Sequence, residues 1–219
     1  MISPFSRDDV DTLVISGGRQ LRRAARPARQ ASYDDEVRQL IKATERVMME
    51  KGRTGQPKVT EVVEAAGMTN QAFYRHFRGR DDLIIATYEQ GMVAVYRYLE
   101  QRVYQHADLV GRLRAWIHGL LRQIEDPALA DLSAIIFWNV AQVPRENTEV
   151  EPVGRERIME LLVTILRAGA VPSPERAGQF VHTLVMGTVS QYLESKTVPT
   201  DADRQALVDF CLAGIGADR

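Results

Sequence analysis

Residues 58–77 read KVTEVVEAAGMTNQAFYRHF and hold the most informative pattern of the chain. Its first half places apolar residues three and four positions apart, which predicts a short amphipathic helix with an inner face of Val59, Val62, Val63 and Ala66. Gly67 follows at a point where a tight turn needs a positive φ. Thr69 can cap a second short helix, whose inner face by spacing holds Ala72, Phe73 and Phe77. Two short helices joined by a glycine turn are therefore predicted.

The outer surface of the predicted second helix is polar. It carries Asn70, Gln71, Tyr74, Arg75 and His76. These side chains can hydrogen-bond to bases or phosphates, and a short helix that presents them after a glycine turn has the geometry of a helix-turn-helix. The spacing alone leaves a second interpretation open, in which the two helices form a hairpin inside a helical bundle.

Helical periodicity continues through the rest of the chain. Acidic residues at 34–36, followed by apolar residues at three- and four-residue intervals, predict a helix from Tyr33 to about Gly52. Further helices are predicted at about 79–105, 108–125, 127–142, 149–169, 173–196 and 201–216. Helix-start signals support these boundaries at Pro127, at Ser173-Pro174 and at a capping box of Thr200 and Asp203. Because no stretch alternates as a strand does, the predicted fold class is all-α with nine helices.

Composition excludes several classes of function. The 219 residues are 45% hydrophobic, and no apolar run approaches the ~20 residues of a membrane helix. Cys211 is the only cysteine, which excludes intrachain disulfides and cysteine-based metal sites and indicates a reducing, cytoplasmic setting. The four histidines are scattered, and the chain has neither a nucleophile elbow nor a phosphate-binding loop. We therefore expect no enzyme activity, no cofactor and no metal.

The net charge of −1 hides an uneven distribution along the chain. Residues 19–82 carry fourteen Lys and Arg against nine Asp and Glu, whereas residues 83–219 carry thirteen against seventeen. A positive segment favours a polyanion as partner, although a charge run is usually a solvated face. Residues 1–33 combine glycine and proline with a run of arginines and lack apolar periodicity. We expect a flexible basic arm there, and an unstructured leader is an equal alternative.

Three fragments of the chain together resemble a known family signature. They are AAGMT at 65–69, FYRHF at 73–77 and RDDL at 80–83. At this spacing they are similar to the N-terminal signature of the TetR family of repressors, over about residues 34–95. The resemblance implies a helix-turn-helix DNA-binding domain at 34–80 and a helical ligand-binding and dimerisation domain at 81–219.

The resemblance also implies roles for single residues. Base edges would be read from the positions that correspond to Asn70, Gln71 and Arg75. The DNA backbone would be contacted from Lys58, Thr60, Tyr74 and Arg80. Thr69, at the start of the second short helix, is also counted among the DNA-binding residues, and His76 can contact either bases or backbone. Two residues depart from the common pattern, because Lys58 stands where the family often has a Thr or Ser cap and Arg80 replaces the more frequent Lys.

Members of this family are homodimers held together by their last two long helices. The corresponding apolar positions here are Phe180, Leu184, Gly187, Tyr192, Leu207, Phe210 and Cys211. Two-fold symmetry then implies a pseudo-palindromic operator in double-stranded DNA, with half-sites about 34 to 36 Å apart or a multiple of that.

The family also implies a cavity for a small-molecule effector in the middle helices. The candidates that combine apolar walls with polar groups are Trp116, His118, Phe137, Trp138, Asn139, Gln142, Met159, His182 and Met186. Ordinary core packing is the competing explanation for each of them. The function expected from the resemblance is that of a transcriptional repressor released from its operator by a ligand. The alternative is a helical protein-interaction module whose helix-turn-helix does not bind DNA.

Overall fold

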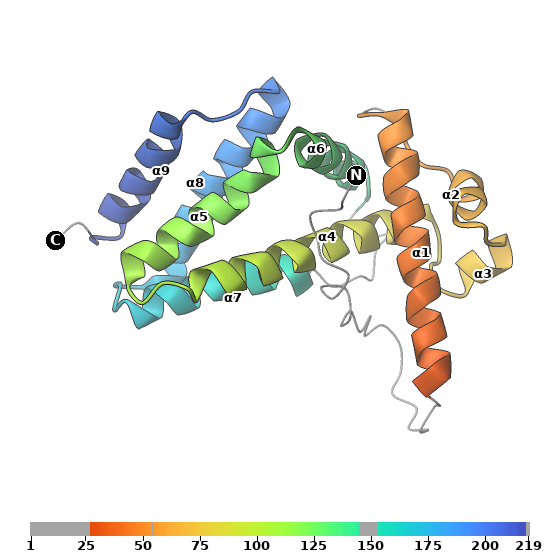
Figure 1. Ribbon diagram of the computed structural model, residues 1–219, viewed down its shortest axis with the longest axis horizontal. Helices are drawn as coiled ribbons and strands as arrows, with labels where there is room; N and C mark the ends of the chain where they lie inside the picture. Colours follow the sequence, from red (N-terminus) through yellow and green to blue (C-terminus); the bar gives the residue numbers. More distant parts are fainter. Residues whose placement is uncertain (1–26, 54, 145–152, 218–219) are drawn as a thin grey trace. The chain divides into compact units, whose positions relative to one another are not determined.

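A computed structural model describes residues 27–53, 55–144 and 153–217, and these ranges are helical without any strand (Figure 1). The helices are α1 (Pro27–Lys51), α2 (Val59–Ala66), α3 (Asn70–Tyr74), α4 (Arg80–Val103), α5 (Leu109–Glu125), α6 (Pro127–Ala141), α7 (Val153–Ala168), α8 (Pro174–Ser195) and α9 (Asp201–Gly214). The predicted all-α fold with nine helices is confirmed over the described part of the chain. None of these helices is both long enough and apolar enough to cross a membrane.

The start of α1 differs from the prediction. The helix begins at Pro27 rather than at Tyr33, inside the segment expected to be a flexible arm. Proline suits the first turn of a helix, and the residues after it include alanine, arginine and glutamine, which favour helix. The acidic residues 34–36 therefore lie within the helix and not in its first turn. Residues 1–26 of the predicted arm, and 149–152 of the predicted seventh helix, lie outside the described residues.

The chain forms two compact units, which divide α4 and α6 between them. The first unit comprises Met1–Gln90 and Ala134–Glu151, and the second comprises Gly91–Ser133 and Pro152–Arg219. The division into functional domains at residue 80 stays a prediction.

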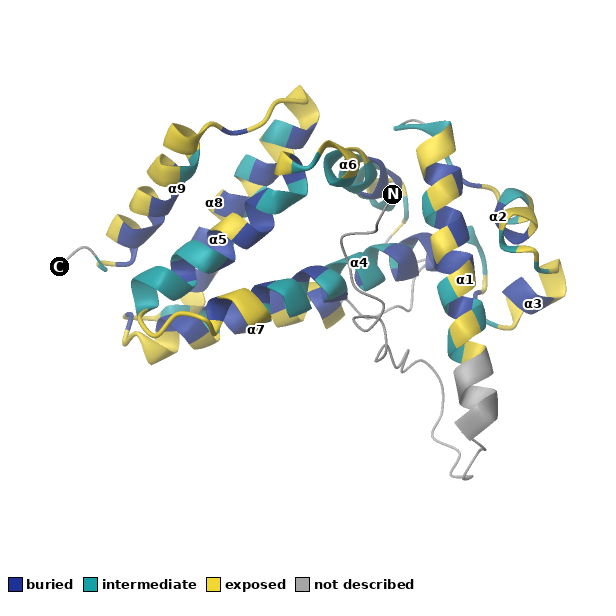
Figure 2. Ribbon diagram, in the orientation of Figure 1, coloured by how far each residue is buried: buried dark blue, intermediate teal, exposed yellow. Residues whose placement is uncertain are grey.

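The core of the first unit is built where α1, α2 and α3 meet. Its buried apolar residues are Val37, Leu40, Ile41, Ala43, Val47, Val62, Val63, Phe73, Phe77, Leu83 and Ala86. The periodic residues of α1 are buried on one face, as predicted, and the buried and exposed stripes alternate around the helix in Figure 2. Since α3 has only five residues, it cannot be stable alone and depends on this core for its position.

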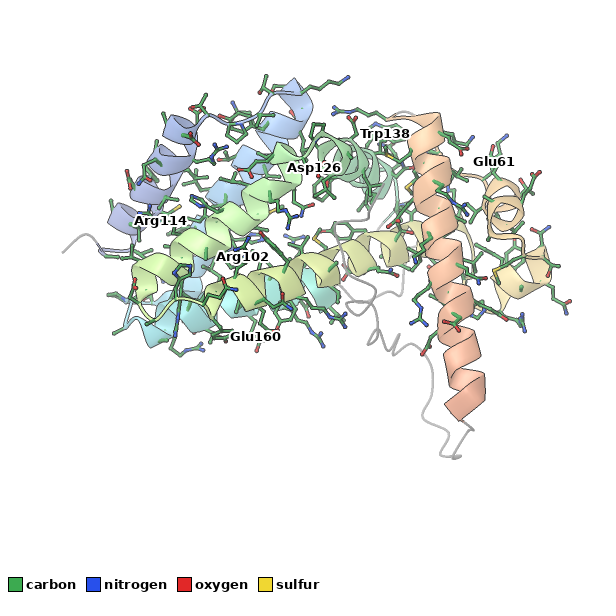
Figure 3. The ribbon with its side chains drawn as sticks, viewed as in Figure 1. Glu61, Arg102, Arg114, Asp126, Trp138 and Glu160 are labelled. Carbon is green, nitrogen blue, oxygen red and sulfur yellow. The ribbon has the colours of Figure 1, made fainter. Side chains whose placement is uncertain are left out.

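Two polar contacts fix α2 against α1. Arg46 Nη2 donates to the carbonyl oxygen of Ala65 at 2.7 Å, near the end of α2. Lys51 Nζ lies 2.8 Å from Oε1 of Glu61, which is labelled on α2 in Figure 3. Glu61 also accepts a hydrogen bond from the backbone N–H of Lys58 at 2.8 Å, and so closes the start of α2. The first of the two short helices is therefore held at both ends.

The second unit is a bundle in which α5 contacts α7, α8 and α9. Helix α7 packs closely against α4 at Gly154. A Cβ built on this glycine would lie 2.6 Å from Met92 Cβ and 2.9 Å from Val93 N, so a larger residue would not fit there. Pro174 opens α8 as predicted. Ser173, expected to cap that helix, has a left-handed backbone (φ 49°) and makes no side-chain cap hydrogen bond, so this detail of the prediction is wrong.

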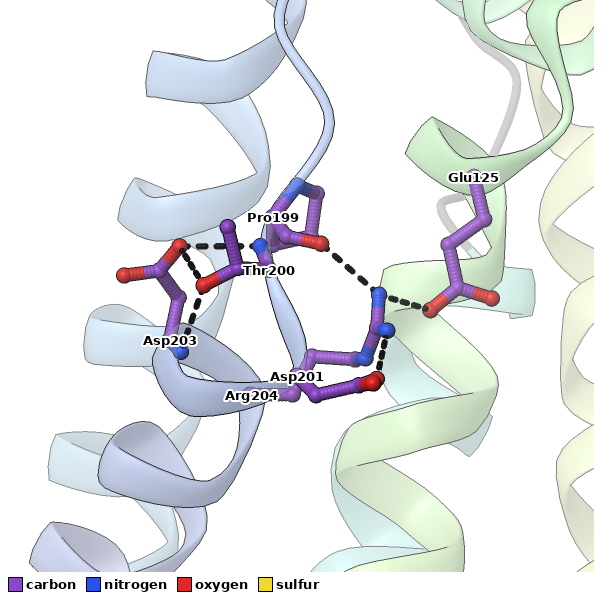
Figure 4. Close-up of polar contacts among 6 residues, drawn as sticks. All are labelled: Glu125, Pro199, Thr200, Asp201, Asp203 and Arg204. Carbon is purple, nitrogen blue, oxygen red and sulfur yellow. Dashed lines mark hydrogen bonds and ion pairs between the residues drawn. The ribbon is translucent and has the colours of Figure 1, made fainter.

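Arg204 ties the start of α9 to the end of α5 (Figure 4). Its Nη1 donates to Pro199 O at 2.8 Å and to Glu125 Oε1 at 3.2 Å, and its Nη2 pairs with Asp201. The predicted capping box is confirmed beside it. Asp203 N donates to Thr200 Oγ1 at 3.2 Å, and Thr200 N donates to Asp203 Oδ2 at 2.9 Å.

Candidate nucleic-acid interface

The turn between α2 and α3 has the backbone that the sequence requires. Gly67 has φ 64° and ψ 31°, and its N–H donates to Glu64 O at 3.0 Å. Met68 N then donates to Val63 O at 2.8 Å, which closes the end of α2. Thr69 caps α3, because its Oγ1 accepts from Ala72 N at 3.1 Å. Both local predictions are confirmed.

The two faces of α3 differ as the helix-turn-helix interpretation requires. Phe73 is fully buried, Phe77 is nearly so, and their ring centroids lie 5.6 Å apart. The outer positions Thr69, Asn70, Gln71, Tyr74 and Arg75 are exposed. Lys58 and Thr60 at the start of α2 are exposed as well. The helix is thus anchored by aromatic residues and presents amide, hydroxyl and guanidinium groups outward.

His76 corrects the prediction, because its side chain is only 1% exposed and does not lie on the outer surface. Its Nε2 lies 2.6 Å from Oε2 of Glu36 on α1, and its ring meets the edge of the Tyr33 ring at a centroid distance of 4.3 Å. Spacing within the predicted second helix indicates an accessible histidine, but in the structure α1 covers the ring from outside residues 58–77.

Glu36 is a residue that the sequence analysis missed as part of this site. The same Oε2 that meets His76 accepts a hydrogen bond from Nη2 of Arg75 at 3.1 Å. The hydrogen bond with His76, together with the charge of Arg75, holds the pKa of the Glu36 carboxyl below its usual range. The sequence shows Glu36 only as part of the acidic run at 34–36, which predicts a helix start and not a contact with residues 75 and 76.

Arg80, expected to contact a phosphate, begins α4 and is about one third exposed. Its Nη1 donates to Gln56 Oε1 at 2.6 Å, and its Nε and Nη2 donate to Asp81 Oδ1 at 3.0 and 2.9 Å. Next to it, Arg78 donates to both carboxylate oxygens of Asp82 at 2.7 and 3.0 Å. The start of α4 is therefore a network of charged groups beside the reading helix.

Residues 40–87 match the profile of the family described as bacterial regulatory proteins, tetR family. This match covers α2, the glycine turn, α3 and the beginning of α4. Residues 40–87 therefore carry the tetR-family signature. A comparison with curated proteins finds no match.

Solved structures of regulators share the fold of this chain. FadR from Bacillus subtilis, solved in complex with stearoyl-CoA, is 19% identical, with 83% of this chain and 99% of that chain covered and a TM-score of 0.63. NalD from Pseudomonas aeruginosa, a repressor of the MexAB-OprM multidrug efflux pump, is 17% identical, with 85% and 100% covered and a TM-score of 0.60. SCO4454 from Streptomyces coelicolor, a TetR-family regulator, is 19% identical, with 89% and 95% covered and a TM-score of 0.59.

The predicted pocket residues fall into both compact units. The first unit holds Phe137, Trp138, Asn139 and Gln142, and the second holds Trp116, His118, Met159, His182 and Met186. Trp116 and Asn139 are fully buried, whereas His118 and Gln142 are exposed, so burial does not support these last two as parts of an enclosed cavity.

Trp116 and His182 are neighbours within the second unit, with ring centroids 6.2 Å apart. Trp116 Nε1 donates to Ile158 O at 3.4 Å. Burial, and secondarily the charge of Arg155, lowers the pKa of His182, which favours a neutral imidazole. In the first unit, Asn139 Nδ2 donates to Ile135 O at 2.9 Å, whereas its buried Oδ1 has no hydrogen-bond partner among the described residues.

The predicted dimer residues separate into outward and inward groups. Phe180 (67% exposed), Phe210 (69%) and Leu184 (36%) project from α8 and α9, and Gly187 is exposed beside them. Tyr192 is half-buried. Leu207 and Cys211 are buried inside the subunit, which corrects their assignment, because they form the inner stripe of α9 and not its outer one.

Proposed function

We propose that this chain is a sequence-specific DNA-binding transcriptional repressor that acts as a homodimer and is released from its operator by a small molecule. The observation that carries the proposal is the two-faced α3. Its buried Phe73 and the nearby Phe77 fix the helix, while Asn70, Gln71 and Arg75 stand exposed at its outer surface. Amide and guanidinium groups can pair bidentately with adenine and guanine, each pair being worth roughly 1 to 3 kcal/mol of discrimination.

Contacts that position the protein would come from the flanks of this surface. Tyr74 is 60% exposed, and Lys58 and Thr60 lie at the exposed start of α2. Arg80 would reach a phosphate by exchanging its bonds to Gln56 and Asp81 for a phosphate oxygen. Such contacts hold the protein on the duplex without selecting its sequence.

A symmetric dimer would supply two reading helices. Three large apolar side chains, Phe180, Leu184 and Phe210, are exposed on two helices that contact each other, and exposed apolar patches of this kind favour association. We expect Phe180→Glu and Phe210→Glu to shift the protein toward the monomer and to weaken binding to a palindromic duplex. The matched control is Val198→Glu, which changes another exposed apolar residue (55% exposed) outside both helices and should leave the mass in solution unchanged.

The effector would bind among the buried aromatic and polar groups of the middle helices. Trp116 and His182 of the second unit support this assignment, because their rings are neighbours, Trp116 is buried, and His182 is partly buried with a polar imidazole. The likeness to a regulator solved with stearoyl-CoA supports a fold that can hold a small molecule. A ligand would release DNA only by binding more tightly to a conformation that fits the operator poorly.

Duplex binding measured over a range of salt concentrations tests the proposal against a helical protein-interaction module. A repressor must show a steep linear fall of log K with log salt, because phosphate contacts release counterions. Arg75→Ala should change the preferred sequence, whereas Tyr74→Phe should weaken binding to all duplexes alike. Arg176→Ala, which removes the same charge from an exposed position on α8, is the control. A protein that ignores duplex DNA at low salt would support the interaction module instead.

A further inference from the structure

A single carboxylate oxygen on α1 meets both residues that follow α3. Oε2 of Glu36 accepts from Arg75 Nη2 at 3.1 Å and lies 2.6 Å from His76 Nε2. The glutamate stands 39 and 40 positions earlier in the chain than these two residues. The end of the reading helix is therefore tied to α1 by a contact that no local pattern specifies.

The histidine half of this contact is rigid. A carboxylate only accepts hydrogen bonds, so Nε2 of His76 carries the hydrogen that points to Glu36. The side chain is 1% exposed, Tyr33 covers one side of the ring, and Nδ1 is buried without a hydrogen-bond partner among the described residues. Since Glu36 accepts the hydrogen bond from Nε2, His76 in turn holds the carboxylate in place.

The arginine half of the contact is open. Arg75 is 60% exposed and meets Glu36 through Nη2. A guanidinium has five N–H donors in a fixed plane, so one bond to Glu36 restrains the group and leaves other donors for a base edge. An arginine restrained in this way loses less side-chain freedom when it binds than one that samples every rotamer.

We propose that Glu36 is a positioning residue that sets the sequence preference of the reading helix by orienting Arg75, without touching DNA itself. The inference rests on the proposed DNA-binding function. Its chemical basis is the shared oxygen, which is fixed by a buried histidine on one side and directs an exposed arginine on the other. A carboxylate near DNA also repels phosphates in general, and the test has to separate this effect from orientation.

The test compares Glu36→Ala and Glu36→Gln with Asp35→Ala by selecting bound sequences from a random duplex library. Asp35→Ala is the matched control, because it removes the same charge from the neighbouring position. The carboxylate of Asp35 pairs with Arg38 on its own helix. Arg75→Ala first identifies the base pair that the arginine reads, where discrimination should fall about 5- to 100-fold.

Glu36→Ala is expected to lower discrimination at that same base pair by about fivefold or more, while preferences at other base pairs persist. Glu36→Gln keeps an oxygen acceptor, so discrimination at that base pair should fall less, by about threefold. This variant can still be measured if the alanine variant unfolds. In the Arg75→Ala background, neither change at Glu36 should alter discrimination further, since the oriented group is gone.

Asp35→Ala should change the affinity for all duplexes alike and leave the preference intact. The proposal is overturned if Glu36→Ala and Glu36→Gln behave as Asp35→Ala does, or if they tighten binding to the preferred duplex without loss of discrimination. Failure of the proposed function has a different signature, because the unsubstituted protein would then show no salt-dependent, sequence-selective binding at all.

Discussion

Gly67 offers a test in which the backbone alone sets the magnitude. It has φ 64°, while Gly79 on the other side of α3 is outside the left-handed region, and a Cβ built on either would meet no atom within 4 Å. Steric clash therefore contributes nothing at either position. An L-residue in the left-handed region is strained by about 1 to 2 kcal/mol. Alanine in place of glycine also restricts the unfolded chain, which stabilises the fold by about 0.4 to 1 kcal/mol at a compatible position.

The two substitutions share the effect on the unfolded chain and differ in the strain. We expect Gly67→Ala to have a free energy of unfolding about 1 to 2 kcal/mol below that of Gly79→Ala, measured by urea denaturation followed by circular dichroism. Gly67→Asn should fall between them, because asparagine tolerates a positive φ better than alanine. Equal unfolding free energies for the two alanine variants would contradict this prediction, since they would mean that the turn needs no left-handed residue.

Three further predictions concern buried groups. Phe73→Ala should lower the free energy of unfolding by about 3 to 5 kcal/mol in a urea titration, because the side chain is fully buried. Asp82→Asn should lower it by about 1 to 2 kcal/mol near neutral pH, since the hydrogen bonds from Arg78 are charge-assisted. Those bonds hold the pKa of Asp82 below its usual 3.8, so the difference from the unsubstituted protein should shrink as the solution is acidified below that value. Burial raises the pKa of Cys211 to about 11, so a maleimide should label it only in the unfolded protein, and rapid labelling of the native protein would contradict this burial.

Acidification should weaken the Glu36 contact, as it should weaken the contact of Asp82 with Arg78. The hydrogen bond with His76 and the charge of Arg75 lower the pKa of the Glu36 carboxyl. The contact therefore stabilises the fold at pH values above the usual pKa range of a carboxyl. This contribution is lost as the pH falls through the lowered pKa of the folded state. The tie between α1 and α3 is therefore intact at neutral pH, where the proposed DNA binding would occur.

Features that depend on neighbours a few residues apart follow from the sequence alone. The helical periodicities, the turn at Gly67, the cap at Thr69 and the capping box at Thr200 and Asp203 follow from φ preferences and hydrogen bonds within one turn. The buried position of Phe73 follows from the same periodicity, since a five-residue helix has one inner face.

Tertiary structure decided what depends on partners far apart in the chain. His76 is buried and Arg75 is directed by Glu36 because α1 passes over the end of α3, and no pattern within residues 58–77 contains that information. Along α9 the apolar stripe was too wide to show which residues face inward. Packing against the rest of the second unit buried Cys211 and left Phe210 at the surface. Local chemistry fixes each helix and its caps, whereas the choice of buried face and of long-range polar partners is made only when the helices pack together.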